Sequence, residues 1–146
     1  MLKVLIAEDN VMLADILEDS LVLGGYEVCG IAYTVDEAVA LADLHKPDLA
    51  VLDFRLADGG YGSQIRQRTQ DKNTMGILYV SADHLNDILT RADGEAYIQK
   101  PYGIDDLLEA VRIVHAIKTN SVVSPILFPK NFHLLEDPIH TYRMSA

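Results

Sequence analysis

Residues 2–10 read LKVLIAEDN, and this stretch establishes the repeating unit of the chain. The run 2–7 is almost entirely apolar, which is typical of a strand that is covered on both faces. Glu8 and Asp9 follow, and Asp9 or Asn10 can cap a helix. The apolar positions of this helix recur every three or four residues until two glycines stop it: Leu13, Ile16, Leu17 and Leu21. The stretch therefore predicts a buried strand followed by a helix.

The same alternation recurs along the chain. Further strands are expected at 26–32, 49–54, 77–81 and 96–99. Further helices are expected from Thr34 to about residue 45, in a short segment that ends at about residue 70, weakly at 85–91, and at 104–118. Five strand–helix units joined by right-handed crossovers predict an α/β fold, a doubly wound five-stranded parallel sheet with helices on both faces.

Composition narrows the class of protein. The chain has 146 residues, 49% of them apolar, and a formal net charge of −10, which repels phosphate backbones and argues against nucleic-acid binding. Cys29 is the single cysteine, so no internal disulfide can form. No apolar run is long enough to span a membrane, and an export signal is absent at the N-terminus. We expect a cytoplasmic protein without a membrane partner.

The pattern changes after residue 118. Residues 119–146 hold three of the five prolines, carry a formal charge of zero, and are too apolar for an ordinary disordered linker. We expect a domain at 1–118 and a C-terminal arm at 119–146. The arm is predicted to be extended and to pack on its own domain or on a second subunit, which would make a homodimer, through five apolar residues: Val122, Val123, Ile126, Leu127 and Phe128.

Chemistry-bearing residues follow four of the predicted strands. The carboxyl ends of parallel strands meet at one edge of a sheet, where ligands bind. The set gathered there is Glu8, Asp9, Asp53, Ser81 and Lys100. Clustered carboxylates repel one another unless they are solvated, protonated or neutralised by a cation, and oxygen ligands suit Mg²⁺. A hydroxyl and an ammonium suit phosphoryl oxygens, and an Asp carboxylate can act as the nucleophile that forms an aspartyl phosphate.

These residues, together with YIQKP at 97–101, resemble the receiver domain of two-component response regulators over about residues 1–118. The resemblance implies a flavodoxin-like (βα)5 receiver fold with Asp53 as phosphoacceptor. It implies that Glu8, Asp9, Asp53 and the backbone carbonyl of Arg55 hold Mg²⁺, and that Ser81 and Lys100 hold phosphoryl oxygens. It also implies that Tyr97 turns inward on activation, with Ser81 as the other switch residue, and that a cis peptide precedes Pro101.

One departure from the family pattern bears on signalling. The interval from Ser81 to Lys100 is short, so we expect an abbreviated or irregular fourth helix on the surface through which receivers usually signal. In the family, the side chains two residues after the acceptor Asp and two after the hydroxyl residue border the path of the hydrolytic water; here they are Arg55 and Asp83, whose opposite charges could pair. We expect this pair to lengthen the lifetime of the phosphorylated state.

The resemblance implies a phosphorylation-dependent switch, phosphorylated by a sensor histidine kinase and not an enzyme beyond its own phosphotransfer and autodephosphorylation. About 28 residues after 118 are too few for a helix-turn-helix module, so output is expected by protein contact or by phosphorelay. One alternative is a receiver-like dimerisation or docking scaffold with vestigial phosphorylation. A phosphatase or mutase would need a second Asp two residues after its nucleophile, and that position is Arg55.

Overall fold

The computed structural model describes residues 1–70, 75–121 and 123–137, and in these ranges it omits the side chains of Asp58 and Ile126. The strands are β1 (Lys3–Ala7), β2 (Glu27–Ala32), β3 (Leu49–Asp53), β4 (Gly76–Ser81), β5 (Ala96–Gln99) and β6 (Phe132–Leu134). The helices are α1 (Val11–Leu23), α2 (Val35–His45), α3 (Ser63–Arg68) and α4 (Ile104–Lys118). Short 3-10 turns lie at Ala57–Gly59 and Pro125–Leu127.

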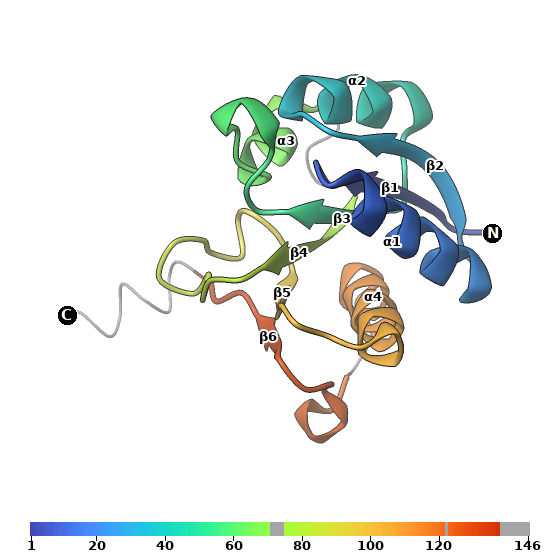
Figure 1. The fold of residues 1–146 in the computed structure, drawn as a ribbon. Coiled ribbons are helices and arrows are strands. Elements are labelled where there is room, and N and C mark those ends of the chain that lie inside the picture. The colour runs from blue at the N-terminus through green and yellow to red at the C-terminus, as the bar shows by residue number, and fades with distance from the viewer. Residues whose placement is uncertain (71–74, 122, 138–146) are drawn as a thin grey trace.

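The strands form one sheet in the order β2-β1-β3-β4-β5-β6. The first five strands are parallel, and β6 pairs antiparallel with β5. Helices α2 and α3 cover one face and α1 and α4 the other, as Figure 1 shows. The doubly wound, flavodoxin-like expectation is confirmed, except that the sheet is mixed and has six strands rather than five.

Each face of the sheet carries its own apolar core. Leu5, Leu52 and Tyr79 are among the buried residues on the α2–α3 side, whereas Ile6, Val51 and Leu78 are among those on the α1–α4 side. Neighbouring residues of a strand therefore alternate between two cores, which explains the unbroken apolar runs in the sequence. None of the helices in the described part of the chain combines the length and apolar character that crossing a bilayer requires.

The first two helices, α1 and α2, start with side-chain caps. The side chain of Asn10 accepts a hydrogen bond from the backbone N–H of Leu13 at 3.1 Å, which starts α1. Thr34 accepts from the N–H of Glu37 at 3.2 Å, and the Glu37 carboxylate accepts from the N–H of Tyr33 at 3.1 Å. This reciprocal capping box starts α2 as its sequence indicates.

The helix predicted at 85–91 is wrong. Between β4 and β5 the described chain forms turns, although Leu85 and Leu89 are buried. The side chain of Asp93 accepts from the N–H of Thr90 at 2.9 Å, and the Thr90 hydroxyl accepts from the N–H of Ala92 at 3.3 Å. Such local bonds compete with helical ones, and the segment holds few strong helix formers.

The extended arm predicted after residue 118 is replaced by a more compact path. Residues Pro125–Leu127 form a 3-10 turn, with Leu127 exposed, and the chain then returns as β6 along β5 (Figure 1). Val123 and Phe128 pack on the core as expected, whereas Val122 and the Ile126 side chain lie outside the described parts. The buried anchors are Phe132 and Leu135. This chain folds back on its own sheet because β5 offers it an open edge.

Candidate phosphorylation site

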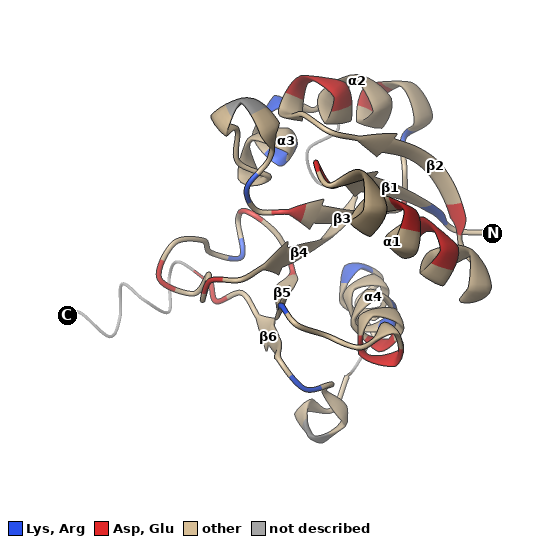
Figure 2. Cartoon of the chain, in the orientation of Figure 1, with Lys and Arg blue, Asp and Glu red and all other residues tan. Residues whose placement is uncertain are grey.

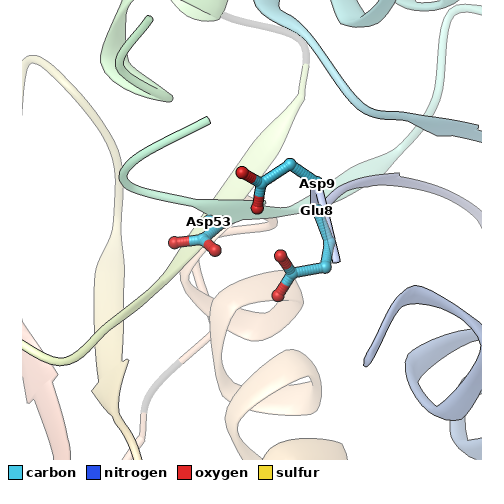
Figure 3. A group of neighbouring side chains, drawn as sticks. All are labelled: Glu8, Asp9 and Asp53. Atoms are coloured by element: carbon cyan, nitrogen blue, oxygen red, sulfur yellow. The ribbon is translucent and has the colours of Figure 1, made fainter. Parts of the chain in front are cut away.

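Three carboxylates converge at the carboxyl edge of the sheet. Glu8 and Asp9 follow β1, and Asp53 ends β3, the neighbour of β1. Each offers an oxygen within 4.8 Å of the others, and Figure 3 shows the groups facing a common space. Figure 2 shows acidic residues at the ends of both strands and a basic residue after β5. The parallel topology therefore brings together acids that are 44 residues apart in sequence (53 minus 9).

Lys100 supplies the positive charge beside these acids. Its backbone N–H donates to the carbonyl of Ser81 at 2.8 Å, which ties the ends of β5 and β4 together. Its Nζ lies 3.4 Å from Asp53 Oδ2 and 3.8 Å from Glu8 Oε1. The Lys100–Pro101 peptide is cis, as the family resemblance implies. One ammonium thus faces two carboxylates.

Glu8 is the most perturbed acid of the cluster. Burial raises its pKa to about 7, the carboxylate of Asp53 adds to the increase, and the backbone N–H of Asn10 and the Lys100 ammonium oppose it. Burial also raises the pKa of Tyr102 to about 12, with contributions from Glu8 and Asp53. Negative charge therefore exceeds what the protein itself neutralises here.

The cluster fits a hard divalent cation. Its donors are all carboxylate oxygens, one of them on the exposed Asp9, so a bound ion could keep several waters. Lys100 neutralises only part of the charge, and a cation would remove the penalty that raises the pKa of Glu8. These observations make Mg²⁺ a chemically suitable occupant.

Asp53 is held in a crowded turn. The backbone N–H of Gly62 donates to the carbonyl of Phe54 at 2.7 Å, which closes the loop after β3. A Cβ at position 62 would lie 2.5 Å from the carbonyl oxygen of Asp53. Only glycine permits this approach, so the loop cannot accept a side chain there without moving the carboxylate.

Ser81 ends β4, one residue beyond the partner of Asp53 in the β3–β4 register. Its side chain is buried, and its hydroxyl accepts from the backbone N–H of Asp83 at 2.9 Å. The same Asp83 forms an ion pair with Arg55, with Arg55 Nη2 at 3.2 Å from Oδ2. The guanidinium also lies 5.7 Å from the ring centroids of Phe54 and Tyr61. Arg55 and Asp83 thus meet beside Asp53.

Tyr97 lies inside the protein rather than at an edge. Its side chain is fully buried in β5, and its hydroxyl has no hydrogen-bond partner among the described residues. The ring stacks on His133 of β6 with centroids 4.9 Å apart. Sequence reasoning missed His133 because nothing in its spacing indicates that it faces β5. It also missed Tyr102, whose only signal is its place two residues after Lys100.

The sequence family agrees with this geometry. Residues 4–112 match the model of the response regulator receiver domain, about three quarters of the chain. The chain belongs to the response regulator receiver family. Receiver domains are regulators in two-component signalling.

One curated relative is a transcriptional regulatory protein. The transcriptional regulatory protein PdtaR of Mycobacterium tuberculosis is 35% identical over 114 residues, which cover 76% of this chain. The chain spans only 55% of the length of PdtaR.

Solved structures show the same fold. The receiver domain of a modulated diguanylate cyclase from Desulfovibrio desulfuricans, described as an example of alternate folding, is 26% identical, with a TM-score of 0.72 over 82% of this chain and 98% of that one. The response regulator PhyR from Brucella abortus is 29% identical, with a TM-score of 0.67 over 82% of this chain and 49% of that one. These proteins therefore share the receiver fold, whereas their names describe different outputs.

Proposed function

We propose that this receiver is a phosphorylation-dependent switch that accepts a phosphoryl group on Asp53 from a sensor histidine kinase. The observation that carries the proposal is the convergence of Glu8, Asp9 and Asp53 around one space, with Lys100 Nζ 3.4 Å from Asp53. A scaffold has no physical need for such concentrated charge, because clustered acids destabilise a fold that does not use them.

The transfer balances as a displacement at phosphorus. An Asp53 carboxylate oxygen forms a bond to phosphorus while the bond between phosphorus and the histidine nitrogen of the kinase breaks, and that nitrogen keeps the electron pair. Lys100 lies where its ammonium can meet one phosphoryl oxygen, and the Ser81 hydroxyl ends the neighbouring strand, where it can meet another. Return to the resting state needs water to attack phosphorus and release inorganic phosphate.

Glu8, Asp9, Asp53 and the backbone carbonyl of Arg55 would hold Mg²⁺. When bound, the ion supplies positive charge that offsets repulsion between the acceptor and an incoming phosphate. The buried Glu8 fixes one side of this site, and the exposed Asp9 leaves room for water on the other.

The kinase would approach over α1. An apolar groove of about 290 Å³ lies between α1 and the start of α4, next to Lys100. Leu13, Ile16 and Ile104 line it and are exposed. Exposed apolar side chains beside a reaction centre favour a protein partner over a small solute. We place this exchange in the cytoplasm, where phosphorylated kinases of this class act.

Output would proceed through protein contact or phosphorelay. Ser81 and Tyr97 would carry the change in the site to β5, and a homodimer is the simplest assembly for β5 to influence. The net charge of −10 disfavours direct contact with nucleic acid.

A titration tests the proposal. Mg²⁺ with acetyl phosphate or beryllofluoride should raise the melting temperature of the natural chain by several degrees, because ligation at 100 times the dissociation constant adds about 2.7 kcal/mol. Asp53→Asn should lose the response to the phosphate donor, and mass spectrometry should find a single phosphoryl group on Asp53. Labelling of another residue, or an equal response in Asp53→Asn, would contradict the proposal and favour the scaffold.

A further inference from the structure

The β5 edge is covered by a short segment from the end of the described chain. Residues Phe132, His133 and Leu134 pair with Ile98, Tyr97 and Ala96. Flanking hydrogen bonds extend the ladder at both ends: Gln99 N–H to Asn131 O at 2.9 Å, Leu135 N–H to Glu95 O at 3.1 Å and Arg91 N–H to Glu136 O at 2.8 Å. In the described part of the chain, the backbone hydrogen bonds that join segment 131–136 to other elements all end on residues 91–99.

The segment also fills the core on both faces of the sheet. Phe132 is 5% exposed on the α1–α4 side, and Leu135 is 4% exposed on the α2–α3 side. If the segment left, β5 would become an open edge with an unpaired backbone and an apolar gap on each face. Such a surface requires an extended occupant with large apolar side chains at these two positions. The sequence Phe-His-Leu-Leu of this chain already meets that requirement.

Much of the connection from α4 to this strand lies at the surface, although Val123 and Phe128 in it pack on the core. Ser121, Ser124, Pro125, Leu127 and Lys130 in it are exposed. A connection of some 12 residues can span up to about 40 Å when extended, enough to reach a neighbouring molecule. Between 123 and 135 Lys130 is the only charged residue, so the segment adds little to the repulsion between two acidic domains.

We propose that the β5 edge is an interface between two copies of this chain, in which each copy places its β6 on the β5 of the other. Exchange of identical strands keeps the pairing and burial of residues 131–136, so it requires no new complementary surface. The two-fold relation also satisfies both edges at once and leaves neither open to further chains. The occupant is therefore residues 131–136 of a second copy.

The exchanged strand lies next to the regulatory site. The Asn131 side chain donates to the carbonyl of Pro101 at 3.0 Å, one residue after Lys100, and His133 stacks on Tyr97. Any movement of Lys100 or Tyr97 therefore changes the surface on which β6 packs, whichever copy supplies the strand. The exchange itself does not depend on phosphoryl transfer, so the two proposals can fail separately.

Two single-cysteine chains test the exchange directly, both in a Cys29→Ser background. One carries Ala96→Cys and the other Leu134→Cys, which are opposed residues lying between the two flanking backbone bonds, at a non-hydrogen-bonded pair where side chains are close. Neither chain can form this disulfide within itself. After the two are mixed and mildly oxidised, the heterodimeric disulfide should form faster as concentration rises.

The matched control replaces Leu134→Cys by Leu127→Cys, in the same tail but exposed and outside the ladder. We expect the Ala96–Leu134 pair to cross-link at least about tenfold faster than this control. Pairing of β6 with β5 holds the two thiols close together and so raises their effective concentration. Equal rates for both pairs would overturn the proposal. If Ala96→Cys does not fold, Ile98→Cys with Phe132→Cys repeats the test at the next non-hydrogen-bonded pair.

Light scattering on the full chain without cysteine substitutions gives a second readout. The exchange is supported if the natural chain is a dimer, Phe132→Ala lowers its measured molar mass towards that of a monomer, and Leu127→Ala does not. A monomer at every concentration, or a dimer indifferent to Phe132→Ala, contradicts it. Both outcomes leave the labelling of Asp53 unaffected, so failure here is distinguishable from failure of the phosphorylation proposal.

Discussion

At the level of single residues, the buried Glu8 carries electrostatic strain beside Asp53. Its pKa is about 7 in the folded state against 4.5 in its ordinary state, so folding favours the protonated form. The stabilisation from that proton is fully present below pH 4.5 and is lost as pH rises towards 7. Glu8→Gln should therefore raise the free energy of unfolding at pH 8 by about 1–3 kcal/mol when Mg²⁺ is absent.

Urea unfolding in EDTA at pH 5 and pH 8 measures this effect. The gain should shrink at pH 5, and Mg²⁺ should stabilise the natural chain but not Glu8→Gln. Asp15→Asn, at an exposed position on α1, is the matched control and should leave both profiles unchanged. If the difference in unfolding free energy between the natural chain and Glu8→Gln is the same at both pH values, Glu8 is not strained.

Arg55 and Asp83 form the ion pair that borders the acceptor. Both side chains are more than 40% exposed, at 63% and 47%, so the pair contributes only about 0.2–1 kcal/mol. If it slows the approach of water, Arg55→Ala should speed loss of the phosphoryl group by about 1.4–5-fold.

The rate of phosphate release from the phosphorylated chain measures the effect. Arg68→Ala breaks a similarly exposed ion pair with Asp36, away from the acceptor, and should leave the rate unchanged. Asp83→Ala should match Arg55→Ala. Equal lifetimes in all three variants would remove the pair from the account of dephosphorylation.

At the scale of elements, β6 depends on a neutral His133. Burial lowers the pKa of His133, and the neighbouring His84, with ring centroids 6.2 Å apart, lowers it further. The folded state thus disfavours the protonated ring. The stability that β6 gains from a neutral His133 is present above pH 6.5, the ordinary pKa of histidine. It is lost as pH falls towards the lowered pKa of His133.

Hydrogen exchange checks this prediction. Protection of the Leu135 amide, which donates to Glu95, should fall between pH 7 and pH 5.5 after correction for the intrinsic rate. His133→Phe keeps an aromatic ring against Tyr97 without a titrating group and should remove most of the dependence. The Leu5 amide in central β1 serves as the internal control. A dependence that persists in His133→Phe would point to another group.

At the scale of the whole molecule, a buried ion pair ties α3 to the starts of β4 and β5. Arg66 of α3 donates to the carbonyl of Met75 at 2.6 Å and to the Glu95 carboxylate at 3.2 Å, and the same carboxylate accepts from the N–H of Ile77 at 2.7 Å. Both charged side chains are less than 10% exposed, at 7% and 4%. The carbonyl of Glu95 also accepts from Leu135, so this network reaches the C-terminal segment.

Arg66→Met should lower the free energy of unfolding by about 3–5 kcal/mol, because it leaves the Glu95 carboxylate buried with Arg91 as its remaining cation at 3.7 Å. Arg66→Met with Glu95→Gln should recover a large part of the loss, since no charge is then stranded and the amide oxygen still accepts from Ile77. Urea unfolding of the four chains of this cycle measures the coupling. Additive losses would show that the two side chains do not depend on each other.

The sequence by itself determined the receiver fold and most of its site. Residues 2–10 carry a local apolar period followed directly by acids, and a parallel sheet necessarily brings such strand ends to one edge. Glu8, Asp9 and Asp53 could therefore be placed together from strand order alone. The ion pair of Arg55 and Asp83 was expected from the resemblance to receiver domains rather than from strand order, and the structure shows the pair.

Only the tertiary structure decided what covers β5. The segment 85–91 has apolar residues at helical spacing, yet local side-chain bonds and the short interval to β5 hold it in turns. The segment 131–136 is too short to signal a strand by periodicity, and its pairing depends on an edge far from it in sequence. Long-range backbone pairing leaves no local signature in the residues that take part, so His133 against Tyr97 became visible only in three dimensions.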